Sequence, residues 1–207
     1  MKTKSIITLL SVLIISLNSC KKDSTEETTT PTPVTPVDNT VCEGKTGVTS
    51  FFPLAQGNQW VYKRNYFASG NPLDSSTVDG TQVYNSVTYM KIREYQGVGS
   101  STVYRYYRVA SNGDVYFYEY GSGIEYLLIP ATPTLNQMLG ADPTHYGTTR
   151  KVTSLTASLT TSTCTYTNLM VIENYGMTGG LVSTVYYKKG MGFVKDGDFQ
   201  VIQAKVN

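Results

Sequence analysis

From about Thr49 to Asn207, short runs of tyrosine, valine, isoleucine and threonine alternate with clusters of glycine, asparagine and serine. β-Branched and aromatic residues favour strands, whereas the intervening residues favour turns. No long helical period separates the runs. We therefore expect an all-β, mainly antiparallel domain: a curved sheet, half-barrel or barrel-like sheet with at most one short helix.

Two polar pairs mark the clearest hairpins. Asn85-Ser86 and Asn112-Gly113 each stand between runs of strand-forming residues. Asn-Gly is a preferred pair for a two-residue type I′ turn. The sequence predicts strands at 59–67, 81–84, 87–95, 101–110, 115–121, 125–130, 148–161, 164–176, 183–190 and 192–207.

One segment, 132–140, fits one or two helical turns. Thr134 would be its N-cap and Gly140 its C-cap. Gly190 and Gly192 bracket Met191, a pattern that suits a bulge or a close backbone approach.

A two-residue turn at Asn112-Gly113 would place Tyr107 opposite Tyr118. Such tyrosines either stack on a sugar or peptide, or stabilise the sheet as cross-strand pairs. We favour the second interpretation and keep the first as a candidate ligand face. That face would consist of Tyr107, Tyr116, Tyr118 and Tyr120.

The stretch "FFPLAQGNQWVYK" holds the only tryptophan, Trp60. Trp60 is either a ligand platform or a plug that closes the core. We favour the plug, because the terminal strands of a curled sheet often pair. We expect Gly57-Asn58 to turn the chain into the first strand. The expected core cluster is Phe52, Leu54, Trp60 and Phe193.

The chain opens with two lysines and a run of 13 mostly apolar residues, Ser5 to Leu17, followed by "LNSC". The run is too short for a membrane-spanning helix, which needs roughly 20 residues, and it suits a secretory signal. "LNSC" resembles the lipobox of bacterial lipoproteins. The resemblance implies a signal peptide over 1–19 and lipidation of Cys20.

Residues 20–48 form the expected tether, rich in threonine and proline. Such a segment cannot bury enough apolar surface to order itself. The acidic cluster after Cys20 resembles a surface-export tag, and the alternative is an ordinary solvated charge run. We expect an outer membrane lipoprotein, on the periplasmic face or the cell surface. A single β-rich domain over 49–207 would follow, with roughly 160 residues.

The balance of charged residues argues against nucleic-acid binding. The sequence holds 17 Lys+Arg and 15 Asp+Glu, and Lys2 and Lys4 leave with the signal, which makes the mature side chains balance. No basic run offers the electrostatic footprint of a nucleic-acid binder.

Catalytic signatures are sparse. His145 is the only histidine, and it has no metal-binding or triad motif around it. We expect no metal, no cofactor and no catalytic residue. A hydrolase of envelope or extracellular polymers is the alternative. It would require Asp196, Asp198 or Glu125 to share a cleft with another carboxylate.

Cys42 and Cys164 remain after lipidation of Cys20. Outside the cytoplasm two thiols can form a disulfide, although spacing alone leaves both states open.

The opening stretch resembles the "FPL-x-x-G-x-x-W-x-Y" motif of a group of uncharacterised bacterial lipoproteins. "VYYKKGMGFVK" resembles their closing "YY-x-x-G-V-G-x-V-K", with Met191 and Phe193 as apolar exchanges. The resemblance implies a curved antiparallel β-sheet domain and no assigned reaction. We expect a lipid-anchored binding or structural module whose partner is a glycan, a peptide or an envelope protein.

Overall fold

The computed structural model describes residues 42–64, 73–142, 148–197 and 199–207. The described residues form twelve strands and no helix. The predictions for 1–41, His145 and Asp198 lie outside them. The strands are β1 (Gln59–Arg64), β2 (Asp74–Tyr84), β3 (Val87–Gln96), β4 (Ser101–Val109), β5 (Val115–Glu119), β6 (Ile124–Ile129), β7 (Met138–Asp142), β8 (Thr148–Thr160), β9 (Thr165–Tyr175), β10 (Leu181–Lys188), β11 (Gly192–Asp196) and β12 (Phe199–Lys205).

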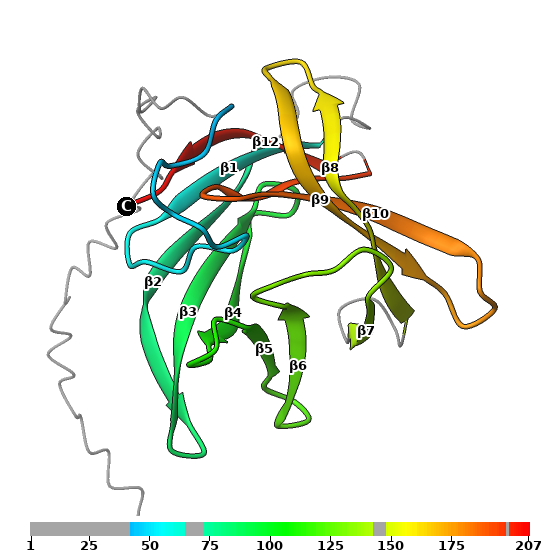
Figure 1. Ribbon diagram of the computed structural model, residues 1–207. Helices are drawn as coiled ribbons and strands as arrows, with labels where there is room; N and C mark the ends of the chain where they lie inside the picture. The colour runs from blue at the N-terminus through cyan, green and yellow to red at the C-terminus, as the bar shows by residue number, and fades with distance from the viewer. Residues whose placement is uncertain (1–41, 65–72, 143–147, 198) are drawn as a thin grey trace, which may run out of the picture. The chain divides into compact units, whose positions relative to one another are not determined.

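The strands form one sheet in the order β6-β5-β4-β3-β2-β1-β12-β11-β10-β9-β8-β7, and every recorded pair is antiparallel. The first half of the chain meanders outward from β1, and the second half returns to pair β12 with β1. Figure 1 shows the sheet curled into a nearly closed barrel, in which the edge strands β6 and β7 come into contact. Strand twist drives such curling. The predicted all-β, antiparallel, barrel-like fold is confirmed.

The pairing of the first and last strands follows the prediction. Trp60 pairs with Ala204, and a bulge separates Val61 from Tyr62. The turn before β1 also forms as predicted, because the Asn58 N–H donates to the Ala55 carbonyl at 3.1 Å.

The β2–β3 hairpin has the predicted two-residue turn. Tyr84 pairs with Val87, and the intervening Asn85 and Ser86 have φ values of 49° and 65°. Positive φ at both central residues defines a type I′ turn, which asparagine and serine tolerate better than bulky residues.

The β4–β5 hairpin differs from the prediction by one residue. Val109 pairs with Val115, and the Ala110 N–H donates to the Asp114 carbonyl at 2.8 Å. The loop therefore has three residues and ends on Gly113, whose φ is 90°. This is a type I turn followed by a left-handed glycine, a common alternative to the two-residue loop.

That one-residue difference changes which face each side chain occupies. Tyr107 pairs with Phe117, not with Tyr118. The prediction that Tyr107 shares a face with Tyr116, Tyr118 and Tyr120 is therefore wrong. Tyr107 points to the inside of the barrel, whereas Tyr116 and Tyr118 lie on the opposite face.

The predicted helical turns are wrong as well. The Gln137 N–H donates to the Thr134 carbonyl, which closes a single turn, and Asn136 has a φ of 63°. The Asn136 N–H then donates to Val152 on β8, and Gly140 lies inside β7 instead of capping a helix. Pairing with β8 outweighs the weak local helix signal.

The predicted core cluster is confirmed. Leu54 and Trp60 are buried, and Phe52 and Phe193 pack against the same cluster as partly buried residues. The Trp60 side chain is 3 % exposed, and its indole N–H donates to the Met191 carbonyl at 2.6 Å. The opening and closing segments of the domain therefore meet at Trp60.

A short segment before Ser50 is fastened to the barrel. A disulfide joins Cys42 to Cys164 with an S–S distance of 1.97 Å. The Lys45 N–H donates to the Gly190 carbonyl, and the Gly190 N–H donates to Ser50, both at 2.9 Å. A Cβ atom on Gly190 would lie 2.5 Å from the Lys45 carbonyl oxygen, so this close backbone approach requires glycine.

Candidate functional site

The barrel encloses a pocket of about 390 Å³. This volume lies near the lower end of the roughly 300–1,000 Å³ range of small-molecule sites. Its lining comes from both halves of the sheet, including β1 to β4 and β8 to β12. The pocket therefore depends on the pairing of β1 with β12, which joins the two halves.

Aromatic side chains form one wall of the pocket. The Phe52 ring lies 5.1 Å from the Tyr107 ring, and the Tyr107 ring lies 5.4 Å from that of Phe117, measured between centroids. Trp60 also lines the pocket while it is buried in the core. The Trp60 ring therefore closes the core and also forms part of the pocket wall.

A first ion pair among the described lining residues joins Arg64 to Asp74. The Arg64 Nε lies 2.5 Å from Asp74 Oδ2, and the Gly97 N–H donates to Asp74 Oδ1 at 2.7 Å. The Asp74 side chain is only 5 % exposed. Two partners therefore compensate the loss of water around this carboxylate.

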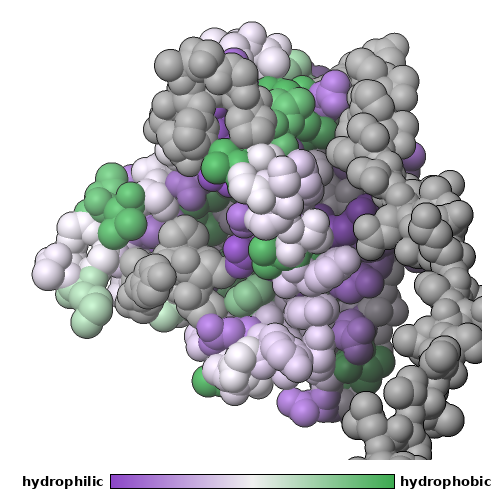
Figure 2. All heavy atoms as spheres, turned by 180° about the vertical axis from the view of Figure 1, so that it is seen from behind, coloured by the Kyte–Doolittle hydropathy of each residue, from purple (hydrophilic) through white to green (hydrophobic). Residues whose placement is uncertain are grey.

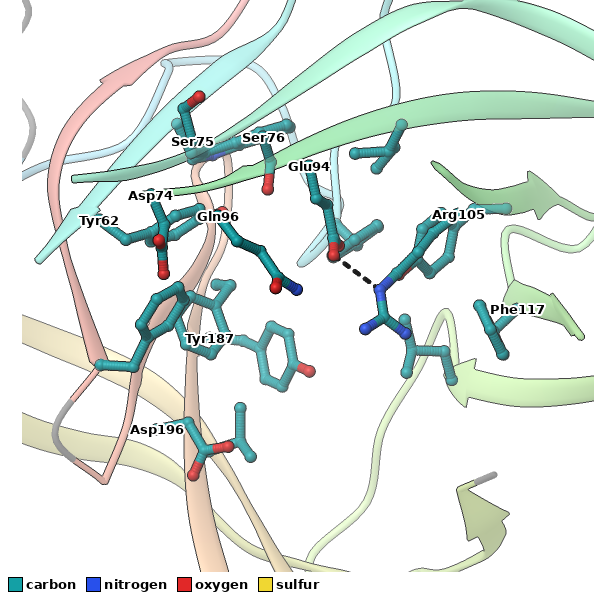
Figure 3. A pocket seen from close by; sticks show the side chains of 18 of the residues that line it. Tyr62, Asp74, Ser75, Ser76, Glu94, Gln96, Arg105, Phe117, Tyr187 and Asp196 are labelled. Carbon is teal, nitrogen blue, oxygen red and sulfur yellow. Dashed lines mark hydrogen bonds and ion pairs between the residues drawn. The ribbon is translucent and has the colours of Figure 1, made fainter. Parts of the chain in front are cut away.

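The second ion pair joins Glu94 on β3 to Arg105 on β4. The Arg105 Nε lies 2.7 Å from Glu94 Oε2, and both side chains reach into the pocket in Figure 3. Their side chains are 24 % and 30 % exposed, so this pair is more accessible than the first. Gln96 lies two residues beyond Glu94 and lines the same pocket.

Tyrosine hydroxyls contribute neutral polar groups. Tyr62 and Tyr187 line the pocket and are both mostly buried. Burial raises the pKa of Tyr62 far above its usual value, although a hydrogen bond with Ser76 acts in the opposite direction. Tyr62 therefore stays protonated across the physiological pH range.

Among the described residues of the lining, the charged side chains balance. They comprise three arginines and three carboxylates, so their formal charges cancel. The six residues are Arg64, Arg105, Arg150, Asp74, Glu94 and Asp196.

Three of the tyrosines singled out from the sequence lie outside the barrel. An outer tyrosine cluster packs ring against ring, with centroid distances from 4.8 to 6.1 Å. Within it Tyr120 is 70 % exposed, whereas Tyr89 and Tyr118 are buried beneath their neighbours. The cluster consists of Tyr84, Tyr89, Tyr106, Tyr118 and Tyr120.

Next to the outer tyrosine cluster, Arg108 forms a two-armed ion pair with Glu125. The Tyr89 hydroxyl donates to the same carboxylate at 2.9 Å, and the Arg108 guanidinium lies 4.6 Å from the centre of the Tyr116 ring. Hydrogen bonds from Arg108 lower the pKa of Glu125. Burial is the main reason that the pKa of Tyr89 rises to about 12.

The carboxylates that the hydrolase alternative would use divide between two places. Asp196 lines the pocket together with Asp74 and Glu94, whereas Glu125 pairs with Arg108 outside it. The described part of the chain contains no group of three or more metal-binding side chains placed to hold an ion. Among the same residues no helix is long and apolar enough to cross a membrane.

The charged pairs of the pocket were missed in the sequence. Arg64 and Asp74 are separated by 10 positions in the sequence, and Glu94 and Arg105 belong to strands in which polar and apolar residues alternate imperfectly. A usable signal was present: Trp60, Tyr62 and Arg64 recur every second residue, and so share one face of a strand. The pattern does not say whether that face is the inner one.

No protein-family model matches this chain, and no curated protein matches it. Two solved structures resemble it. A "putative exported protein with YmcC-like fold" from Bacteroides fragilis is 10% identical, with a TM-score of 0.47 over 75% of this chain and 98% of that one. A "putative lipoprotein" from Parabacteroides distasonis is 13% identical, with a TM-score of 0.42 over 76% and 99%. At this level of similarity we transfer no ligand, partner or activity.

Proposed function

We propose that this chain is a lipid-anchored, non-catalytic binding protein of the bacterial envelope, and that its ligand occupies the interior pocket. The observation that carries the proposal is the charged lining of the barrel interior. Side chains can fill the interior of a barrel of about eight strands, and the diameter grows with the number of strands, so a sheet of twelve leaves room for a cavity. Here Arg64–Asp74 and Glu94–Arg105 surround an unfilled volume of about 390 Å³.

Stability alone does not account for these pairs. Removing two charges from water costs free energy, and an apolar pair of similar size is often as stabilising. Inward-facing ion pairs around a cavity are therefore better explained by recognition. The face in Figure 2 agrees with an internal site, because its visible hydrophobic side chains form separate patches among polar ones.

The anchor is the second part of the proposal. The signal-like run, the "LNSC" sequence and the proline-rich tether support lipidation of Cys20. The anchor would attach the protein to a membrane, and we propose that this is the outer membrane, at the periplasmic face or the cell surface. Metabolic labelling with palmitate should mark the wild-type protein. The variant Cys20→Ser should remain unlabelled, and its signal peptide should either stay attached or be cleaved at another position.

Ligand occupancy can be tested with the full-length protein. Ser76 points into the pocket (Figure 3), so Ser76→Phe should fill part of it. Small molecules that copurify with the wild type would be extracted and identified by mass spectrometry. We expect the Ser76→Phe sample to lose them, while circular dichroism shows an intact β fold.

The matched control is Ser122→Phe, which changes an exposed serine in the β5–β6 turn. It should retain the wild-type set of copurified molecules. Identical extracts from wild type and both variants would contradict a ligand site in the pocket.

A hydrolase is the alternative, favoured by the three carboxylates that line the pocket: Asp74, Glu94 and Asp196. A glycoside hydrolase needs one protonated and one ionised carboxyl group across the bond that is cleaved. Asp74 and Glu94 are both engaged with arginines, which suits binding better than proton donation. Time-dependent conversion of a bound ligand, abolished in Asp196→Asn, would establish the alternative.

A further inference from the structure

We propose that the pocket binds a neutral, polyhydroxylated ligand: a sugar of one or two rings. This inference rests on the proposed binding function and names the ligand class for the same site. Three properties of the lining support it, namely its charge balance, its planar polar groups and its aromatic wall.

Charge balance argues for a ligand without net charge. The three arginines and three carboxylates among the described lining residues cancel, and two of the arginines already pair with carboxylates inside the pocket. An anionic ligand would compete with Asp74 and Glu94 for the guanidinium groups. A zwitterion would compete with both members of each pair.

The polar groups are suited to hydroxyls. Glu94 accepts hydrogen bonds, Arg105 donates them, and the Gln96 amide does both. Figure 3 shows these three side chains and the Tyr187 hydroxyl directed at the same space. A sugar hydroxyl is both donor and acceptor, so it can bond to any of these groups without displacing an ion pair.

The aromatic wall would contact the C–H face of a sugar ring. Phe52, Tyr107 and Phe117 form a continuous set of rings beside the polar groups. Aromatic side chains offer a large apolar surface, and tyrosine adds a polar tip. An apolar wall facing a polar wall matches a molecule with an apolar face and a hydroxyl-bearing rim.

The volume sets the size of the ligand. A pocket of about 390 Å³ lies among the smaller ligand sites, and side chains from both halves of the barrel surround it. The ligand would therefore be a mono- or disaccharide, or the end of a longer glycan.

Trp60 fluorescence can report ligand binding, because Trp60 is the only tryptophan and lines the pocket. The full-length protein would be studied in a polyoxyethylene detergent, which carries no sugar headgroup. Trp60 emission and heat of binding would be recorded with neutral mono- and disaccharides, with glucuronate and with the dipeptide Gly-Phe. We expect saturable binding of at least one neutral sugar, about tenfold or more tighter than glucuronate or the dipeptide.

A variant that removes one charge from the pocket tests whether charge selects the ligand. Glu94→Gln removes one negative charge from the pocket, so it should weaken the neutral sugar and improve glucuronate relative to it. Glu125→Gln is the matched control, because it breaks an ion pair outside the pocket and should leave the order of affinities unchanged. A merely structural role for Glu94 would weaken all ligands alike.

Two results would overturn the proposal: tighter binding of glucuronate or Gly-Phe than of every neutral sugar, or no response to any neutral sugar. Either can occur while Ser76→Phe still removes a copurified molecule of another class. In that case the binding function stands and only the ligand class fails.

Discussion

Trp60 has two roles at the residue scale. Its indole N–H is bonded to the Met191 carbonyl, and its ring is 3 % exposed, so it closes the core. The same ring lines the pocket. A Cβ atom on Gly192 would lie 3.5 Å from the indole nitrogen, so the closing segment passes directly against the ring.

Trp60→Ala should therefore destabilise the domain by about 3–5 kcal/mol, the usual cost of emptying a large buried aromatic site. Urea unfolding followed by far-UV circular dichroism would measure the loss. Tyr120→Ala is the control, because this ring is 70 % exposed and should matter little. An unchanged unfolding curve for Trp60→Ala, together with lost ligand binding, would mean that the ring serves only the pocket.

The role of a residue could be predicted from the sequence where burial of its side chain determines that role. The burial of Leu54 and Trp60 follows from a hydrophobic opening motif on a terminal strand. The pocket charges could not be predicted, because Glu94 and Arg105 become partners only through the register of β3 with β4. A charged residue in a strand is ordinarily solvent-facing.

At the scale of elements, one side chain bridges the seam between β6 and β7. β6 and β7 are the two edges of the sheet, and no ladder joins them among the described residues. Arg150 on β8 donates to the carbonyls of Leu127 and Leu128 on β6, and to Gly140 on β7. Its guanidinium thus connects the two edges from within.

Arg150→Met should open this seam. The change leaves three carbonyls without this donor, and the loss of a hydrogen bond to a charged group costs about 1.5–3 kcal/mol, less where water can replace the donor, as at the exposed Gly140. We expect a comparable fall in the free energy of unfolding and faster amide hydrogen exchange in β6 and β7 than in β1 and β12. Arg93→Met is the control, since Arg93 is half exposed and pairs with Asp79 at 3.6 Å. Equal exchange in all four strands would contradict the role of Arg150.

The elements themselves were largely predictable, and their exact turns were not. Asn112-Gly113 correctly marks a hairpin, but the pair occurs in both two- and three-residue loops. The choice follows from packing: the three-residue loop aligns Phe117 with Tyr107 inside the barrel. Inward burial of these two rings therefore selects the register that the turn residues leave open.

For the whole molecule, closure joins segments that are distant in the sequence. β1 pairs with β12, and Cys42 bonds to Cys164 across 122 residues. Pairing of the terminal strands was predictable, because a long curled sheet leaves two edges that must be covered or paired. The disulfide was not, because spacing does not reveal which strand the segment at Cys42 meets.

The disulfide should be a large part of the stability of the domain. In the chain-entropy model, a closed loop of over 100 residues restricts the unfolded chain by about 4–5 kcal/mol, an upper value. Cys42→Ser/Cys164→Ser should lower the free energy of unfolding accordingly and raise amide exchange around Lys45. Before that comparison, alkylation without reductant should leave both cysteines unmodified in the wild type.

Amide exchange at Lys45 distinguishes a local effect of the disulfide from a global one. It bonds to Gly190 through the backbone, and that contact does not need the disulfide. If the double variant frees only the segment before Ser50 while the barrel unfolds at the wild-type urea concentration, the bond fastens the tether and does little else. If the whole barrel becomes less stable, the crosslink acts on the unfolded chain, as its long loop implies.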